Sequence, residues 1–123
     1  DRKKMAVVRG RSKPAVTHFS VIRAFGLAAC LMECQLETGR THQIRVHMTE
    51  FGRPLIGDPL YGGPTKARIA ALQTDTKDAV RHFPRQALHA GILGFEHPRT
   101  GEWLKFASEL PSDIRNLLQI LET

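Results

Sequence analysis

The sequence has little cysteine and no long apolar run, and both absences narrow the class of protein. It contains only two cysteines in 123 residues, too few for a disulfide framework, so a reducing cytoplasm suits the composition. No apolar stretch approaches the roughly 20 residues that cross a membrane. The first residues, Asp1-Arg2-Lys3-Lys4, do not form a signal peptide. Since the chain does not begin with Met, we expect it to be a fragment of a longer protein.

Internal repeats and low-complexity tracts are also absent, whereas positive charge is abundant. Lysine and arginine number 18 against 12 acidic residues, which gives a formal net charge of +6 and a sequence pI of about 9.9. An apolar share of 41% is enough for one ordered domain. So basic a domain suits a polyanionic partner, with RNA or DNA as first candidates, although many basic domains bind no nucleic acid.

Alternating and continuous apolar patterns predict four strands. Residues 16–25 and 27–36 flank a turn at Gly26, and so short a connection allows only an antiparallel hairpin. The second of these strands is almost continuously apolar, which is typical of a buried strand. Residues 85–95 and 102–106 predict another pair, joined by the turn formers of residues 97–101.

Two helices are predicted with clear ends. The first covers residues 42–50, with Thr41 as N-cap and a buried stripe of Ile44, His47 or Met48, and Phe51. The second begins near Pro111 and buries one face. That face comprises Ile114, Leu117, Leu118 and Leu121.

The remaining segments are predicted to be irregular. Residues 1–14 form a basic connecting arm with a short strand at 5–8, and residues 65–83 form a polar surface insertion with a short helix near 68–72. The order of elements indicates an α+β fold with a mainly antiparallel sheet and flanking helices.

Residues 36–47 carry the most chemistry, because they place a glycine turn, two arginines and two histidines where a buried strand becomes a helix. A helix N-terminus offers free backbone N–H groups to a phosphate, and Arg40, Thr41 and His42 lie at its mouth. Arg45 lies one turn further in, beside Ile44. If its guanidinium is buried, it requires a carboxylate partner; the alternative is that Arg45 points into solvent.

Metal and thiol chemistry are disfavoured. Four histidines (His42, His47, His89 and His97) lack the spacing of a metal site, and no metal is expected. Cys30 and Cys34 are interpreted as small core residues, since nothing near them in sequence would lower a thiol pKa.

The series of motifs resembles the RluA/RluD type of ribosomal large-subunit pseudouridine synthases. The resemblance covers nearly the whole chain and is weakest at residues 65–83. It is carried by LETGRTHQIRVH at 36–47, GRPLIGDPLYGG at 52–63, RQALHA at 85–90, HPRTGE at 97–102 and LPSD at 110–113. It implies that the chain is the C-terminal portion of the synthase catalytic fold.

The resemblance also implies a reaction. Such enzymes isomerise uridine to pseudouridine in large-subunit ribosomal RNA, without cofactor or metal, after the base is flipped out of its stack. An aspartate is the nucleophile, and the arginine that pairs with it corresponds to Arg45. That aspartate belongs to an upstream Arg-Leu-Asp motif which these 123 residues do not contain. We therefore expect the chain to be inactive by itself.

Several residues are assigned to binding rather than chemistry. Lys3, Lys4, Arg9 and Arg11 are expected to follow the RNA backbone. Leu88 is a candidate wall of the uracil pocket, although plain core packing is the commoner role for such a residue. Asp58 is interpreted as a side chain that fixes its loop. The alternative functions are a non-catalytic RNA-binding module and a structural or protein-interaction domain.

Overall fold

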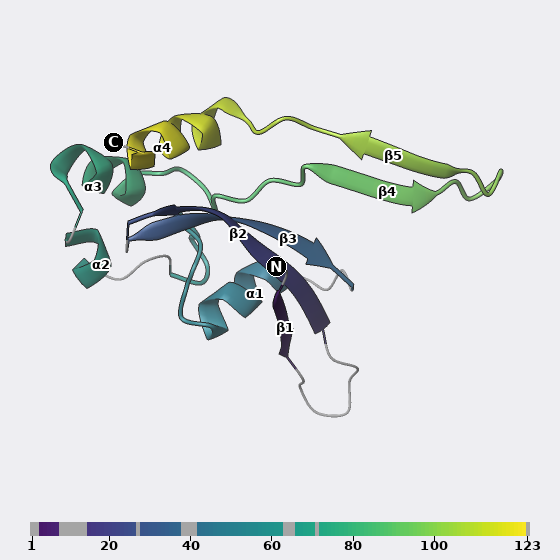
Figure 1. Ribbon diagram of the computed structural model, residues 1–123, viewed down its shortest axis with the longest axis horizontal. Coiled ribbons are helices and arrows are strands. Elements are labelled where there is room, and N and C mark those ends of the chain that lie inside the picture. The colour runs from purple at the N-terminus through teal and green to yellow at the C-terminus, as the bar shows by residue number, and fades with distance from the viewer. Residues whose placement is uncertain are drawn as a thin grey trace.

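The fold is α+β, as predicted, with two antiparallel sheets and four helices among the residues that the structure describes (Figure 1). The computed structural model describes residues 3–7, 15–26, 28–37, 42–62, 66–70 and 72–122. The elements in chain order are β1 (Lys3–Val7), β2 (Ala15–Phe25), β3 (Ala29–Leu36), α1 (Gln43–Glu50), α2 (Lys66–Ala70), α3 (Thr74–Arg81), β4 (Ile92–Glu96), β5 (Trp103–Ala107) and α4 (Ser112–Glu122).

The first sheet has the strand order β1-β2-β3, with both pairs antiparallel. The predicted hairpin of β2 and β3 is confirmed, and Gly26 makes its turn at φ +58°. A bulge interrupts the pairing between Val21 and Arg23. The predicted short strand near the N-terminus starts earlier than expected, because β1 begins at Lys3 and pairs along β2. Part of the predicted connecting arm is therefore a strand of the sheet.

Polar side chains attach α1 to the sheet. Gln43 donates from Nε2 to the Val16 carbonyl at 2.9 Å and to Thr17 Oγ1 at 3.0 Å, and Thr17 Oγ1 lies 2.8 Å from His47 Nδ1. Thr17 is fully buried, and Gln43 and His47 are nearly so. Because burial disfavours the imidazolium, the pKa of His47 is lowered from its ordinary value.

The predicted apolar stripe of α1 is only partly correct. His47 and Met48 are buried, but Ile44 is half-buried and Phe51 is 55% exposed. Gln43 takes their place at the sheet, where its amide binds the Val16 carbonyl, which also accepts the Glu37 backbone N–H at 3.1 Å. The helix therefore packs through hydrogen bonds as much as through apolar contact.

The expectation that β3 is buried is wrong. Cys30 is exposed, Cys34 is half-buried and Leu36 is 42% exposed. An apolar run does not show whether another layer covers a strand, and β3, at the edge of the described sheet, keeps these side chains open. The interpretation of Cys30 as a core residue is wrong for the same reason. Partial burial raises the pKa of Cys34, which leaves its thiol a poor nucleophile.

Two helices form within residues 65–83, where the sequence predicted one short helix in a surface insertion. The unexpected one is α3, which packs on α4. Val80 from α3 and Ile114 and Leu117 from α4 are buried there. The predicted face of α4 is thus confirmed at Ile114 and Leu117, whereas Leu118 and Leu121 are half-buried.

The second sheet is the hairpin of β4 and β5, which stands away from the other elements (Figure 1). Its pairing runs from Ile92 with Ala107 to Glu96 with Trp103. The predicted strand at 85–95 begins only at Ile92, because the Arg85 side chain takes up the carbonyls of Gln86 and Leu88. None of the described helices is long and apolar enough to cross a membrane.

Candidate functional site

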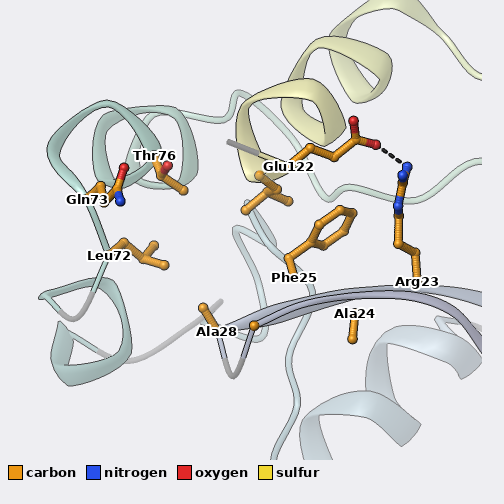
Figure 2. Close-up of a pocket in the computed structure, with 10 residues that line it drawn as sticks. Arg23, Ala24, Phe25, Ala28, Leu72, Gln73, Thr76 and Glu122 are labelled. Carbon is orange, nitrogen blue, oxygen red and sulfur yellow. Dashed lines mark hydrogen bonds and ion pairs between the residues drawn. The ribbon is translucent and has the colours of Figure 1, made fainter.

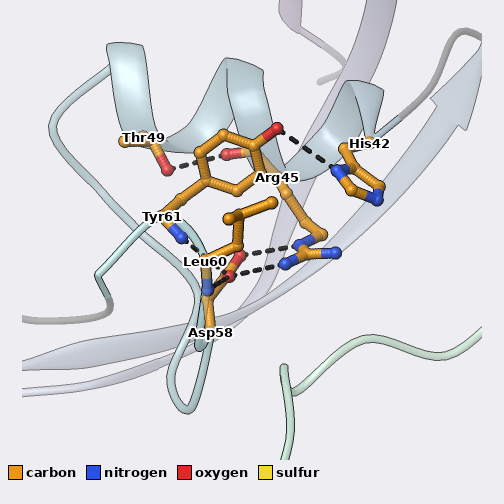
Figure 3. A network of polar contacts seen from close by, with 6 residues as sticks. All are labelled: His42, Arg45, Thr49, Asp58, Leu60 and Tyr61. Atoms are coloured by element: carbon orange, nitrogen blue, oxygen red, sulfur yellow. Dashed lines mark hydrogen bonds and ion pairs between the residues drawn. The ribbon is translucent and has the colours of Figure 1, made fainter.

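Arg45 is buried and forms a two-point ion pair. Its guanidinium donates from Nε to Asp58 Oδ2 and from Nη2 to Asp58 Oδ1, both at 2.8 Å (Figure 3). Arg45 is 8% exposed, so the alternative in which it points into solvent is wrong. The carboxylate that a buried guanidinium requires is supplied within the chain by Asp58, thirteen residues further on. The sequence did not predict this pairing.

Asp58 also fixes the loop around it, as predicted. Its Oδ1 accepts the backbone N–H of Leu60 at 3.0 Å and of Tyr61 at 3.1 Å, the pattern of an Asx turn. Hydrogen bonding to Arg45, and then to these N–H groups, holds the pKa of Asp58 well below its usual range, although burial opposes the shift. The same pairing raises the pKa of Arg45. Both groups are therefore charged at neutral pH.

Tyr61 and His42 complete a polar network above the pair. The Arg45 Cζ atom lies 5.2 Å from the centroid of the Tyr61 ring, in a cation–π contact. The Tyr61 hydroxyl lies 3.2 Å from His42 Nδ1, and the two rings meet edge to face (Figure 3). No prediction assigned Tyr61 to a site. Tyr61 lies over the guanidinium because the turn that Asp58 fixes places it there.

The start of α1 differs from the prediction. The N-cap is His42 rather than Thr41, and within the described residues no side-chain hydrogen bond caps the helix. His42 has φ 52° and ψ 29°, a left-handed conformation that non-glycine residues seldom adopt. Such strain concentrates at functional sites, where the surrounding structure maintains it. Here it brings the imidazole to Tyr61.

Arg45 and His42 open onto a cavity of about 320 Å³. This volume is at the lower end of the range for small-molecule sites, about 300–1,000 Å³. Three segments contribute its walls: the end of β3, the start of α1 and the chain after Arg85. The lining residues are Leu36, His42, Gln43, Ile44, Arg45, Gln86 and Leu88. Leu88, the predicted wall residue, therefore lies in the same cavity as Arg45.

The third wall is held by Arg85 and by a close backbone approach. Arg85 donates from Nε and Nη2 to the two Asp113 carboxylate oxygens at 2.9 Å each, and from Nη1 to the Gln86 and Leu88 carbonyls. Gly57 lies so near that a Cβ atom there would meet the Arg85 carbonyl oxygen at 2.1 Å. The pocket thus depends on contacts between segments distant in sequence.

The predicted RNA-binding residues are placed only in part. Arg9, Arg11, Arg40 and Thr41 lie outside the described residues. For Lys3 and Lys4 the structure describes backbone alone, in β1 opposite β2. His42 is the member of this set that the described part of the chain places beside Arg45.

A larger cavity, of about 630 Å³, shares no lining residue with the cavity at Arg45. Figure 2 shows the residues that line it. It is lined by the turn after β2, the segment between α2 and α3, and the end of α4. Arg23 and Glu122 form an ion pair at its rim (Figure 2). No residue predicted to be functional lines it. In the described part of the chain, no three His, Cys, Asp or Glu side chains are arranged to hold a metal ion.

Comparison with known proteins gives a consistent result. Residues 1–50 match the RNA pseudouridylate synthase family. Over 98% of its length the chain is 49% identical to the ribosomal large subunit pseudouridine synthase D of Zymomonas mobilis, and 52% identical to the protein of that name from Neisseria meningitidis serogroup A. The chain is therefore similar to RNA pseudouridine synthases over nearly its whole length. It spans about a third of these curated relatives, 36% and 31% of their lengths.

A solved structure supports the same assignment. The human RNA pseudouridylate synthase domain containing 4 matches with a TM-score of 0.66 at 30% sequence identity, over 94% of this chain and 46% of that chain. The resemblance identified from the sequence motifs is therefore confirmed, and so is the fold.

Proposed function

We propose that the chain contributes the arginine-bearing part of the active site of an RNA pseudouridine synthase that acts on large-subunit ribosomal RNA. The observation that carries this proposal is the buried Arg45, held at two points on the wall of a cavity of about 320 Å³. Similarity to the RNA pseudouridylate synthase family suggests the chemistry, and the relatives named for the ribosomal large subunit suggest the substrate class.

The cavity suits an extruded uracil. An RNA base must leave its stack to be remade, and it is then held by apolar walls and a few polar groups. Leu36, Ile44 and Leu88 offer the apolar walls, and Arg45 with Gln86 offers hydrogen-bond donors. In the reaction, the N1–C1′ bond breaks, the uracil turns while it stays bound in the cavity, and a C5–C1′ bond forms. C5 loses a proton and N1 gains one.

Arg45 would hold the nucleophilic carboxylate ionised and oriented. The family's Arg-Leu-Asp motif does not occur in these 123 residues. We propose that the nucleophile comes from the part of a full-length synthase that lies beyond the aligned region. Metal or cofactor plays no part in this proposal.

RNA is the proposed partner and the cytoplasm the proposed location. The net charge of +6 favours a polyanion. His42 at the cavity is the described residue best placed for RNA. Arg40, Thr41, Lys3, Lys4, Arg9 and Arg11 are proposed as backbone contacts.

The test is a chimera in which this chain replaces the aligned segment of the full-length Zymomonas mobilis relative. Turnover is measured as tritium release from RNA labelled at uridine C5. We expect Arg45→Lys to lower kcat by about 100-fold or more, because lysine keeps the charge but cannot form the forked pair. The exposed Arg115→Ala is the matched control. Normal turnover by Arg45→Lys refutes the proposal.

A non-catalytic RNA-binding module is the second candidate, favoured by the lack of the Arg-Leu-Asp motif within the chain. The isolated chain should release no tritium under either proposal. The chimera separates the two, since a binding module yields RNA binding without turnover.

A further inference from the structure

Asp58 divides its two carboxylate oxygens between two tasks. Oδ1 accepts the Leu60 and Tyr61 N–H groups as well as Arg45 Nη2, while Oδ2 accepts Arg45 Nε. The Asp58 side chain is 0% exposed, so water does not replace any of these partners. The loop is fixed through Oδ1 alone, because both backbone N–H groups bind that oxygen. Oδ2 serves Arg45.

The pairing determines where the rest of the guanidinium points. A guanidinium is planar, so once Nε and Nη2 are bound the direction of Nη1 is set. Among the described residues, Nη1 donates no hydrogen bond, and Figure 3 shows this nitrogen pointing away from Asp58. Tyr61 covers one face of the group. Arg45 lines the cavity, and Nη1 is the guanidinium nitrogen that does not bind Asp58.

Charge compensation adds a second consequence. Arg45 and Asp58 together carry no net charge, and the described surroundings add only His42 and Tyr61 as titratable groups in contact. The cavity therefore offers a directed N–H rather than a bare cation. An uncompensated guanidinium would favour a phosphate of the RNA backbone over a neutral base.

We propose that Asp58 is a positioning residue, which holds Arg45 by its Nε and Nη2 edge so that Nη1 is aimed into the cavity. The proposal rests on the pseudouridine synthase function proposed above. It assigns Asp58 a role in turnover through Arg45, in addition to fixing the loop.

Asp58→Asn separates the two tasks. The asparagine Oδ1 still accepts the Leu60 and Tyr61 N–H groups, so the turn is kept. Its amide nitrogen replaces Oδ2 and faces the Arg45 Nε–H, donor against donor, so the forked pair is lost. If the asparagine variant does not fold, Asp58→Ser gives the same comparison, because its hydroxyl also accepts turn N–H groups.

The experiment is a double-mutant cycle in the chimera, with Asp58→Asn, Arg45→Lys and the combined variant. Circular dichroism first confirms that each is folded at the assay temperature. We expect Asp58→Asn to lower kcat about tenfold or more with KM changed less than about threefold. Added to Arg45→Lys, it should lower kcat by less than about twofold, because the two residues act as one unit.

Two outcomes overturn the inference. One is an unchanged kcat for Asp58→Asn. The other is that Asp58→Asn lowers kcat by the same factor in the parent chimera and in the Arg45→Lys chimera. A purely structural role of Asp58 would produce that result. In both cases an active parent chimera leaves the proposed function standing, whereas an inactive parent chimera counts against the proposed function itself.

A second measurement tests positioning without turnover. In nitrogen NMR of the chimera, the Arg45 Nε–H signal is identified by its loss in Arg45→Lys. We expect a sharp, slowly exchanging signal in the parent and its loss or broadening in Asp58→Asn. An equally sharp signal in Asp58→Asn refutes the role of Asp58, whatever the activity.

Discussion

The region around α1 and the hairpin of β4 and β5 are stabilised in different ways. Around α1, polar side chains such as Thr17, Arg45 and Asp58 are buried, and no buried side-chain nitrogen or oxygen of the described residues lacks a partner. In the hairpin, the apolar side chains Trp103 and Leu93 are 68% and 60% exposed. The first region is specified by directional bonds and the second by its backbone ladder.

The difference shows where the chain is sensitive to change. A buried polar group costs free energy as soon as its partner is removed, whereas an exposed apolar group loses little on substitution. We therefore expect single substitutions around α1 to lower the stability more than substitutions of exposed residues in the hairpin of β4 and β5. Four predictions test that ranking, from the largest expected effect to the smallest.

Arg45→Ala should be the most damaging change. It leaves the Asp58 carboxylate buried without its countercharge, and breaking such a pair costs about 3–5 kcal/mol. Urea unfolding of the unsubstituted chain and of the Arg45→Ala variant measures the difference in the free energy of unfolding. Arg45→Lys is the control, since it keeps a positive charge near Asp58 and should lose less. Equal stability of Arg45→Ala and the parent would show that the pair contributes nothing to the fold.

Gly57→Ala should come next, at about 2–3 kcal/mol of lost stability. The new Cβ meets the Arg85 carbonyl oxygen at 2.1 Å, and the backbone has φ +77°. Gly62→Ala is the matched control, with φ +91° but no atom of the described residues within 4 Å of the added Cβ, so it carries only the conformational cost of about 1 kcal/mol. Thermal unfolding compares them. If both lose the same stability, the close approach to Arg85 is not tight.

His47 should make stability depend on pH. Its pKa is lowered in the folded chain by burial, so below its ordinary value of 6.5 the unfolded state binds the proton and the folded state does not. Stability should therefore fall as the pH drops below 6.5, and be constant above it. His47→Gln, which does not titrate, should flatten the difference in urea midpoint between pH 7.5 and pH 5.5. If His47→Gln shows the same difference in urea midpoint between the two pH values as the unsubstituted chain, His47 is not the cause.

Trp103→Ser should have the smallest effect, within about 0.5 kcal/mol of the parent. The side chain is 68% exposed and the strand pairs through backbone groups. Met48→Ala, at a residue of 6% exposure, serves as the buried contrast and should lose about 2–5 kcal/mol. A large loss for Trp103→Ser would contradict the division between the two regions.

Local patterns predicted the regular elements well. The β2–β3 hairpin, the turn at 97–101 and the buried residues Ile114 and Leu117 of α4 follow from periodicity and turn residues, because these act over a few positions. The burial of β3 did not follow, since an apolar run does not say whether another layer covers it. Helix α3 was missed because its sequence is polar except for the Val80 face that meets α4.

Of the buried ion pair at the candidate site, only Arg45 was predicted from the sequence. Arg45 stood out because a guanidinium on the inner side of a helix requires a carboxylate, yet nothing in the sequence said which one. Asp58 could have been suggested as a carboxylate in a loop of glycines and prolines. Tyr61 carried no signal of its own.

By itself, the sequence determined the class of fold, the resemblance to pseudouridine synthases and the choice of Arg45 as a candidate, because motifs and periodicity are properties of neighbouring residues. The tertiary structure alone decided the partner of that arginine and the walls of its pocket. Arg45, Asp58 and Leu88 come from separate segments, and they meet because Gly57 lets the loop approach Arg85, whose side chain holds the third wall. Contacts of this kind depend on the packing of the whole chain, which no local pattern encodes.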